Sequence, residues 1–136
     1  MKLLGIDYGR RRIGLAITDQ DGAGIRGLPT VDRNKTPDSI QVILSIIARE
    51  KPGALVVGLP LDFLDNETDM SKEVRVFADE LKVKSGLEIH FVDESFLSVR
   101  AQELLRFRKK KERRDKGSVD RLSACLILEQ FRESNQ

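Results

Sequence analysis

The chain has 136 residues, of which 40% are hydrophobic and 34% charged, and its formal net charge is only +2. These values predict one globular domain, residues 1–136, and exclude wholesale disorder. A membrane-spanning helix needs roughly 18 consecutive apolar residues, and the sequence has no such run, so we expect no membrane partner. The single cysteine has no disulfide partner in the chain, which favours a reducing, cytoplasmic setting.

Two short apolar runs, at 2–6 and 13–18, open the chain and are joined by a turn that contains glycine and arginine. This pattern predicts a β-hairpin. Asp7 follows the first run, where a strand interior would stay apolar. A buried carboxylate needs a positive partner, so we expect an arginine from the turn or a metal ion beside it. The alternative is that Asp7 only caps its own turn.

The later elements follow from apolar periodicity and from glycine, proline and cap signals. Further strands are expected at 25–31, 54–58 and 87–92. Helices are expected at 36–50 with Thr36 as the cap, at 70–84, after Ser98, and at 119–132 with Ser118 as the cap. The last two strands each follow a helix and should run parallel to the first. The predicted fold class is therefore α/β, a five-stranded mixed sheet flanked by helices.

Three carboxylates are expected to meet at one edge of this sheet. Asp7 ends the first strand, Glu94 follows the fifth, and Asp120 falls in the first turn of the last helix. Ligands of such sheets bind beyond the carboxyl ends of the parallel strands. Each acid has a simpler explanation, because Asp120 could stabilise a helix start and Glu94 could be a solvated partner of Asp93. Together, converging oxygen ligands are typical of Mg²⁺ or Mn²⁺, and paired ions of this kind support phosphodiester cleavage.

Basic residues flank this candidate site. Arg10, Arg11 and Arg12 follow Asp7, and a basic segment leads to Asp120. From that segment we expect nucleic-acid contacts by Lys109, Lys110, Lys111, Arg113, Arg114 and Lys116. The alternative is a solvated charged face. The chain has six Phe, one Tyr and no Trp, so base stacking is a poor primary mode and backbone recognition is favoured.

Four segments resemble, in order, the motifs of the YqgF family: Asp7-Tyr8-Gly9 with Arg12-Ile13-Gly14, Val57-Gly58-Leu59-Pro60-Leu61, Asp93-Glu94, and Lys116-Gly117-Ser118-Val119-Asp120. Members of this family are described as pre-16S ribosomal RNA nucleases and as Holliday-junction-resolvase-like proteins. The resemblance implies a ribonuclease H-like fold and a divalent-metal-dependent nuclease. It also implies that Asp7, Glu94 and Asp120 are both metal ligands and catalytic residues.

The chain departs from the family pattern in two places. The family commonly has an arginine after the glutamate, where this chain has Ser95, and Arg100 is the candidate substitute. The loop 61–66 differs in length and charge, so we expect its contacts to differ as well.

The leading hypothesis is a hydrolase of ester bonds that acts in 5′-end maturation of pre-16S ribosomal RNA. One alternative is a Holliday junction resolvase for branched DNA, which would need a homodimer for paired cuts, whereas a trimming nuclease could be a monomer. A second is a non-catalytic factor that binds structured RNA during ribosome assembly. A third is an actin-like phosphotransferase, which shares the Asp-x-Gly hairpin but needs two such domains.

Overall fold

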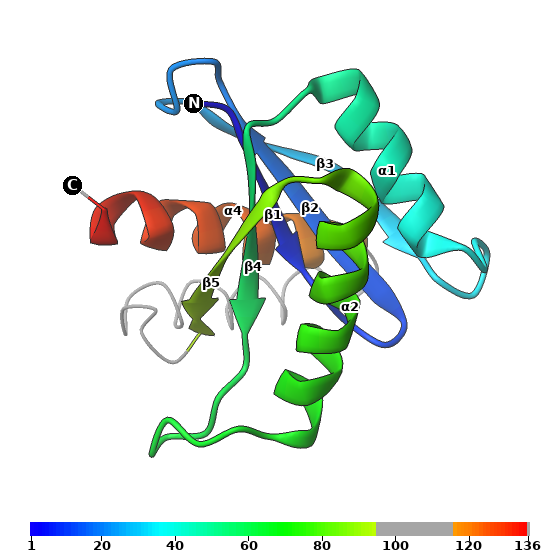
Figure 1. The fold of residues 1–136 in the computed structure, drawn as a ribbon, viewed down its shortest axis with the longest axis vertical. Helices are drawn as coiled ribbons and strands as arrows, with labels where there is room; N and C mark the ends of the chain where they lie inside the picture. The colour runs from blue at the N-terminus through cyan, green and yellow to red at the C-terminus, as the bar shows by residue number, and fades with distance from the viewer. Residues whose placement is uncertain (95–115, 136) are drawn as a thin grey trace.

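The computed structural model describes residues 1–94 and 116–135, and within them a central sheet carries helices on both faces (Figure 1). The strands are β1 (Leu3–Asp7), β2 (Arg12–Thr18), β3 (Ile25–Asp32), β4 (Ala54–Leu59) and β5 (Glu88–Asp93). The helices are α1 (Ser39–Glu50), α2 (Asp69–Ser85) and α4 (Lys116–Ser134). None of these helices is both long and apolar enough to cross a membrane.

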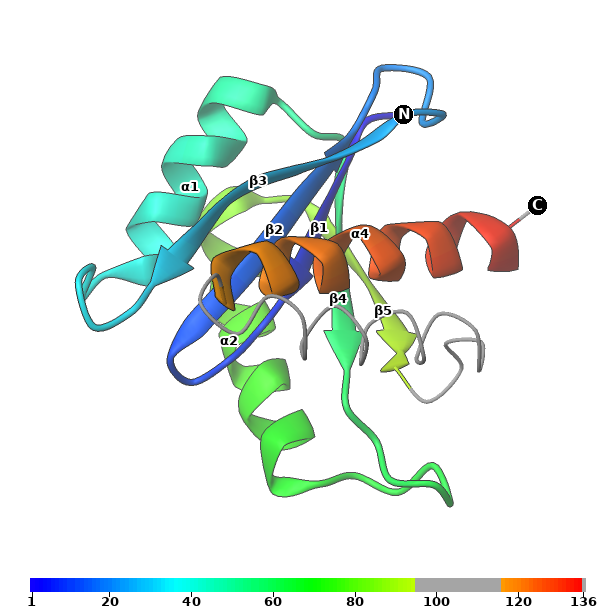
Figure 2. The same cartoon turned by 180° about the vertical axis from the view of Figure 1, so that it is seen from behind.

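The strand order is β3-β2-β1-β4-β5. Strand β1 pairs antiparallel with β2 and parallel with β4, and β4 pairs parallel with β5, which confirms the predicted mixed sheet. Figures 1 and 2 show from opposite sides that α1 and α2 cover one face and that α4 crosses the other. The carboxyl ends of β1, β4 and β5 therefore lie at one edge of the sheet.

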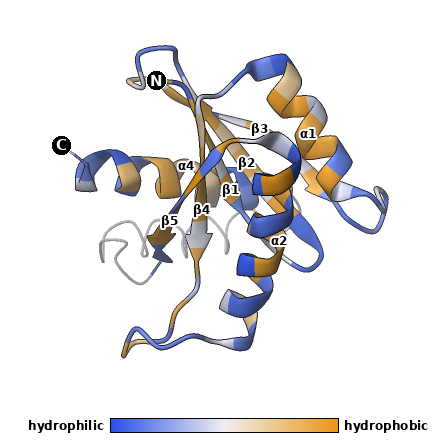
Figure 3. Ribbon diagram, in the orientation of Figure 1, coloured by the Kyte–Doolittle hydropathy of each residue, from blue (hydrophilic) through white to orange (hydrophobic). Residues whose placement is uncertain are grey.

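Each face of the sheet has its own apolar layer, and Figure 3 shows hydrophobic residues along the strands and on the helix sides that meet them. Under α1 and α2 the layer includes Leu4, Ile6, Ile43, Leu55 and Leu81. Under α4 it is built from Ala16, Val56, Ala124, Ile127 and Leu128, among others. Strand β4 is buried at every residue because both of its faces are covered, as its unbroken apolar run predicts.

Two predicted helix starts are wrong. Asp38, not Thr36, caps α1, because its carboxylate accepts a hydrogen bond from the main-chain N–H of Gln41 at 3.1 Å. The N–H of Thr36 instead closes the turn after β3, where it donates to the carbonyl of Asp32 at 2.9 Å. Helix α4 begins earlier than predicted, so Ser118 lies within it and does not cap it. The helix expected after Ser98 lies outside the described residues.

Candidate active site

Glycines on the α4 face of the sheet let this helix lie against the strand backbone. A Cβ added to Gly5 would lie 2.6 Å from Cγ of Leu128. One added to Gly14 would lie 2.1 Å from the main-chain oxygen of Asp120. Real atoms cannot approach so closely, so side chains at these positions would push α4 away. The glycines of β1 and β2 thus set the distance between α4 and the sheet.

Asp7 lies between two of these small residues. Gly14 is its partner in the antiparallel pairing of β1 with β2. On the other side, Gly58 follows Val57, which is the partner of Ile6 in the parallel pairing of β1 with β4. Neighbouring residues of paired strands point to the same face, and side chains alternate along each strand. The Asp7 side chain therefore points to the α4 face, and the strand position on either side of it carries no side chain.

The other two predicted carboxylates lie over these glycines. Oε1 of Glu94 is 2.5 Å from where a Cβ of Gly58 would sit, and Cβ of Asp120 is 3.1 Å from the corresponding position on Gly14. Opposed positions of paired strands are roughly 5 Å apart. The structure thus brings the three predicted acids to one edge and one face of the sheet, with Asp7 in the middle.

These carboxylates do not form a closed metal site as they stand. Within residues 1–94 and 116–135, no three side chains of Asp, Glu, His or Cys are close enough together to hold one ion. Asp120 is turned toward Arg12, whose Nε donates to Oδ2 at 2.9 Å. The oxygen donors suit Mg²⁺ or Mn²⁺, and Arg12 engages one of the two oxygens of Asp120.

The position of Asp120 removes one alternative explanation. It lies in the second turn of α4, because the helix begins at Lys116, so the predicted place in the first turn is wrong. The error came from reading Ser118 as the cap. The helix macrodipole acts within the first turn. Stabilisation of the helix start therefore does not explain why an acid stands here.

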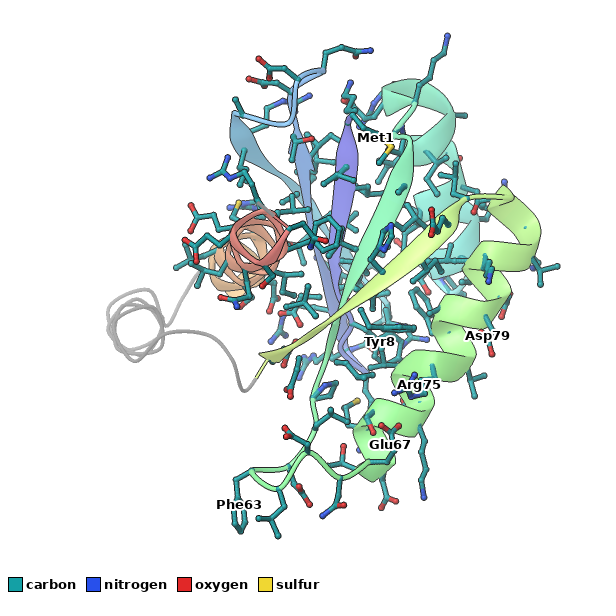
Figure 4. The ribbon with its side chains drawn as sticks, turned by 60° about the vertical axis from the view of Figure 1, so that its left-hand side comes forward. Met1, Tyr8, Phe63, Glu67, Arg75 and Asp79 are labelled. Atoms are coloured by element: carbon teal, nitrogen blue, oxygen red, sulfur yellow. The ribbon has the colours of Figure 1, made fainter. Side chains whose placement is uncertain are left out.

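The turn after Asp7 is hydrogen-bonded to α2. The Tyr8 hydroxyl donates to Oε1 of Glu73 at 2.8 Å, and Nε of Arg10 donates to Oε2 at 2.9 Å. The guanidinium of Arg33 lies 5.0 Å from the centre of the Tyr8 ring. Figure 4 shows Tyr8 on the α2 side of the sheet. Glu73 and Arg33 are not predicted from the sequence, because they come from other elements and no spacing links them to Asp7.

The acid dependence of stability should change when Glu73 is replaced by glutamine. The hydrogen bond from Tyr8, and then the one from Arg10, hold the pKa of Glu73 below its ordinary value. Because the folded state has the lower pKa, the carboxylate stabilises the fold at neutral pH, and this contribution is lost as the pH falls through the folded-state value. Urea unfolding should therefore show a smaller loss of stability between pH 6 and pH 3 in Glu73→Gln than in the wild type.

The matched control for this experiment is Glu80→Gln, on the same helix. Glu80 forms a surface ion pair with Lys84. This variant should lose about as much stability on acidification as the wild type. Equal losses in Glu73→Gln and the wild type would contradict the role assigned to Glu73.

Only three side chains of the predicted nucleic-acid contacts lie among the described residues. Arg10 pairs with Glu73 and Arg12 with Asp120, whereas Arg11 is exposed. Arg10 and Arg12 thus form ion pairs with α2 and α4, respectively. The other predicted contacts have side chains outside the described part of the chain: Arg100, Lys109, Lys110, Lys111, Arg113, Arg114 and Lys116.

The loop between β4 and α2 brings further acids to the same edge. The carboxylate of Asp62 accepts hydrogen bonds from the N–H groups of Leu64 and Asn66 at 2.8 and 2.9 Å. A hydrogen bond with Asp93 raises the pKa of the Asp65 carboxyl. Phe63 projects from the tip of this loop and is 89% exposed (Figure 4). The loop 61–66, which departs from the family pattern, is therefore acidic and is held by hydrogen bonds between its own residues.

The family model described as "RuvX: Holliday junction resolvase" matches residues 1–134. A candidate pre-16S rRNA nuclease of Crocosphaera subtropica is 37% identical over 128 residues, which cover 94% of this chain and 90% of the relative. A protein of the same name from Oleidesulfovibrio alaskensis is 39% identical over 133 residues, with coverages of 96% and 91%.

Two solved structures share the fold. Thermus thermophilus RuvC in complex with a Holliday junction substrate aligns with a TM-score of 0.64 at 18% identity, over 98% of this chain and 96% of that one. Fowlpox virus resolvase with Holliday junction DNA aligns with a TM-score of 0.62 at 14% identity, over 99% of both chains. These likenesses confirm the predicted ribonuclease H-like fold.

Proposed function

The chain belongs to the RuvX family of Holliday junction resolvases, a family of nucleases, and we propose that it cleaves precursor 16S ribosomal RNA near the 5′ end. The observation that carries this proposal is the position of Asp7 between Glu94 and Asp120 on one face of the sheet. The names of the relatives supply the substrate. With this substrate, we also propose a cytoplasmic location for the protein. Family membership argues against the actin-like phosphotransferase.

We assign Asp7, Glu94 and Asp120 to the binding of Mg²⁺ or Mn²⁺. The donors fit such an ion, because all are carboxylate oxygens, and the glycines beside Asp7 let Glu94 and Asp120 approach positions that a Cβ would otherwise block. When bound, the cation would polarise the scissile phosphate and lower the pKa of water. Asp7 pairs with Gly14 of β2 and directly follows Ile6, which pairs with Val57 of β4, so its side chain is the fixed point on which the other two carboxylates converge.

Basic residues around this edge would hold the polyanionic substrate by its phosphates. Arg11 is exposed beside the turn that follows Asp7. Arg10 and Arg12 would exchange their carboxylate partners for phosphate. We propose the same role for Arg100, Lys109, Lys110, Lys111, Arg113, Arg114 and Lys116. Binding of this kind should weaken steeply as the salt concentration rises.

The likeness to RuvC bound to a Holliday junction favours a second candidate function. A resolvase would cut two strands of a four-way junction and would act as a homodimer. An RNA-trimming nuclease needs only one active site for each cut and therefore does not require a second subunit. Both candidates use the same three carboxylates, so only the substrate and the oligomeric state separate them.

We expect the purified protein to cut a transcript that spans the 5′ end of pre-16S RNA in the presence of Mg²⁺ or Mn²⁺ and to leave a four-way DNA junction intact. Addition of EDTA should abolish the cleavage. Paired cuts in the junction, with no cleavage of the RNA and a dimeric mass in solution, would instead support the resolvase. Tight RNA binding without cleavage in either metal would overturn the nuclease and support the non-catalytic assembly factor.

A further inference from the structure

The ion pair between Arg12 and Asp120 joins the start of β2 to α4. Its Nε–Oδ2 distance is 2.9 Å, and the two side chains are 27% and 21% exposed. The pair between Arg10 and Glu73 has the same distance but is more open, with exposures of 63% and 35%. Since water screens exposed charges, the more shielded pair has the stronger attraction. Arg12 therefore holds Asp120 more firmly than a surface arginine would.

This contact conflicts with the role assigned to Asp120. The carboxylate oxygen that accepts from Arg12 belongs to one of the three groups proposed to bind the cation. A guanidinium and a divalent ion at one carboxylate repel each other, so each lowers the affinity of the other for it. In the absence of another partner for Arg12, the protein should bind a divalent ion weakly.

A phosphate group of the substrate can supply that partner. Guanidinium groups bind phosphate oxygens through two parallel hydrogen bonds, a geometry at least as favourable as the single contact with Oδ2. Arg12 also follows Arg11, which is exposed at the same edge of the sheet. Nucleic acid that approaches the carboxylates thus meets Arg12 together with its neighbours.

We propose that Arg12 is a positioning residue that couples substrate binding to metal binding. In the free protein it holds Asp120 out of the metal site, and a phosphate of the bound nucleic acid takes Arg12 and releases Asp120. The coupling must act in both directions, so bound cation should also raise the affinity for nucleic acid. This inference rests on the proposed metal-dependent nuclease function.

The test measures Mn²⁺ affinity by electron paramagnetic resonance of the free ion, with the full-length protein and no substrate. We expect Arg12→Gln to bind Mn²⁺ at least about 5-fold more tightly than the wild type, the lower end of typical coupling. A phosphorothioate RNA hairpin should raise the affinity of the wild type by a similar factor and that of Arg12→Gln by much less. The double variant Arg12→Gln/Asp120→Asn should not show the tighter Mn²⁺ binding of Arg12→Gln.

The matched control is Arg10→Gln, which removes the same charge from the same turn but breaks a pair with Glu73. Its Mn²⁺ affinity should equal that of the wild type, and circular dichroism checks that each variant is folded. If Mn²⁺ binds but Arg12→Gln binds it no more tightly than the wild type, the coupling role of Arg12 is wrong and the metal site stands. If no variant binds Mn²⁺, the proposed metal site fails and the coupling fails with it.

Discussion

Replacement of Asp7 by asparagine is expected to lower the rate of phosphodiester cleavage at least about 100-fold. Mutation of a residue that only hydrogen-bonds to a metal ligand already lowers metal affinity or activity by about 10–100-fold, and Asp7 is proposed to bind the metal directly. Asparagine keeps the shape of the side chain but removes the charge, and its amide N–H₂ group repels a cation. The fold should tolerate the change, because fewer negative charges then face one another at the edge of the sheet. Single-turnover cleavage of the pre-16S transcript with Mn²⁺ measures the loss, and filter binding without divalent metal should show that RNA affinity is retained.

The control for this variant makes the same chemical change away from the site. Asp38 caps α1 through its carboxylate, and asparagine caps helices equally well. Asp38→Asn should therefore cleave at the rate of the wild type. An Asp7→Asn protein that also cleaves at that rate would show that Asp7 does not bind the catalytic metal, whatever the substrate.

The sheet and the acidic edge could be predicted because their signals are local in the sequence. The apolar run of β4 indicates a strand covered on both faces, and the helix before it requires a crossover that makes it parallel to β1. Asp7 is the last residue of β1, and Glu94 directly follows β5. Their common edge therefore follows from topology alone, before any side chain is placed.

The contacts that shape the site could not be predicted in this way, because they connect residues far apart in the sequence. Arg12 reaches Asp120 across 108 positions, and Tyr8 reaches Glu73 across 65. The sequence shows Gly14 as part of a turn motif, but its role depends on α4, which packs against it. The same limit explains the misplaced start of α4, since a serine followed by an acid resembles a cap wherever it occurs.

Replacement of Gly14 by alanine is expected to lower the free energy of unfolding by about 1–3 kcal/mol, the usual cost of an overpacked contact. The new Cβ would lie 2.1 Å from the main-chain oxygen of Asp120, so the first turns of α4 must move. Alanine also restricts the unfolded chain, but this gain is only about 0.4–1 kcal/mol and cannot offset the clash. Because Asp120 moves with the backbone, cleavage of the transcript should fall together with stability in urea denaturation.

Gly53→Ala is the control, because there the added Cβ would meet only the end of a flexible side chain. The nearest atom is Cγ of Met1 at 2.5 Å, and Met1 is 66% exposed and can rotate away. This variant should be as stable as the wild type or slightly more stable. If Gly14→Ala unfolds at the same urea concentration as Gly53→Ala, then α4 does not lie against β2 as described, and Asp120 loses the support that places it beside Asp7.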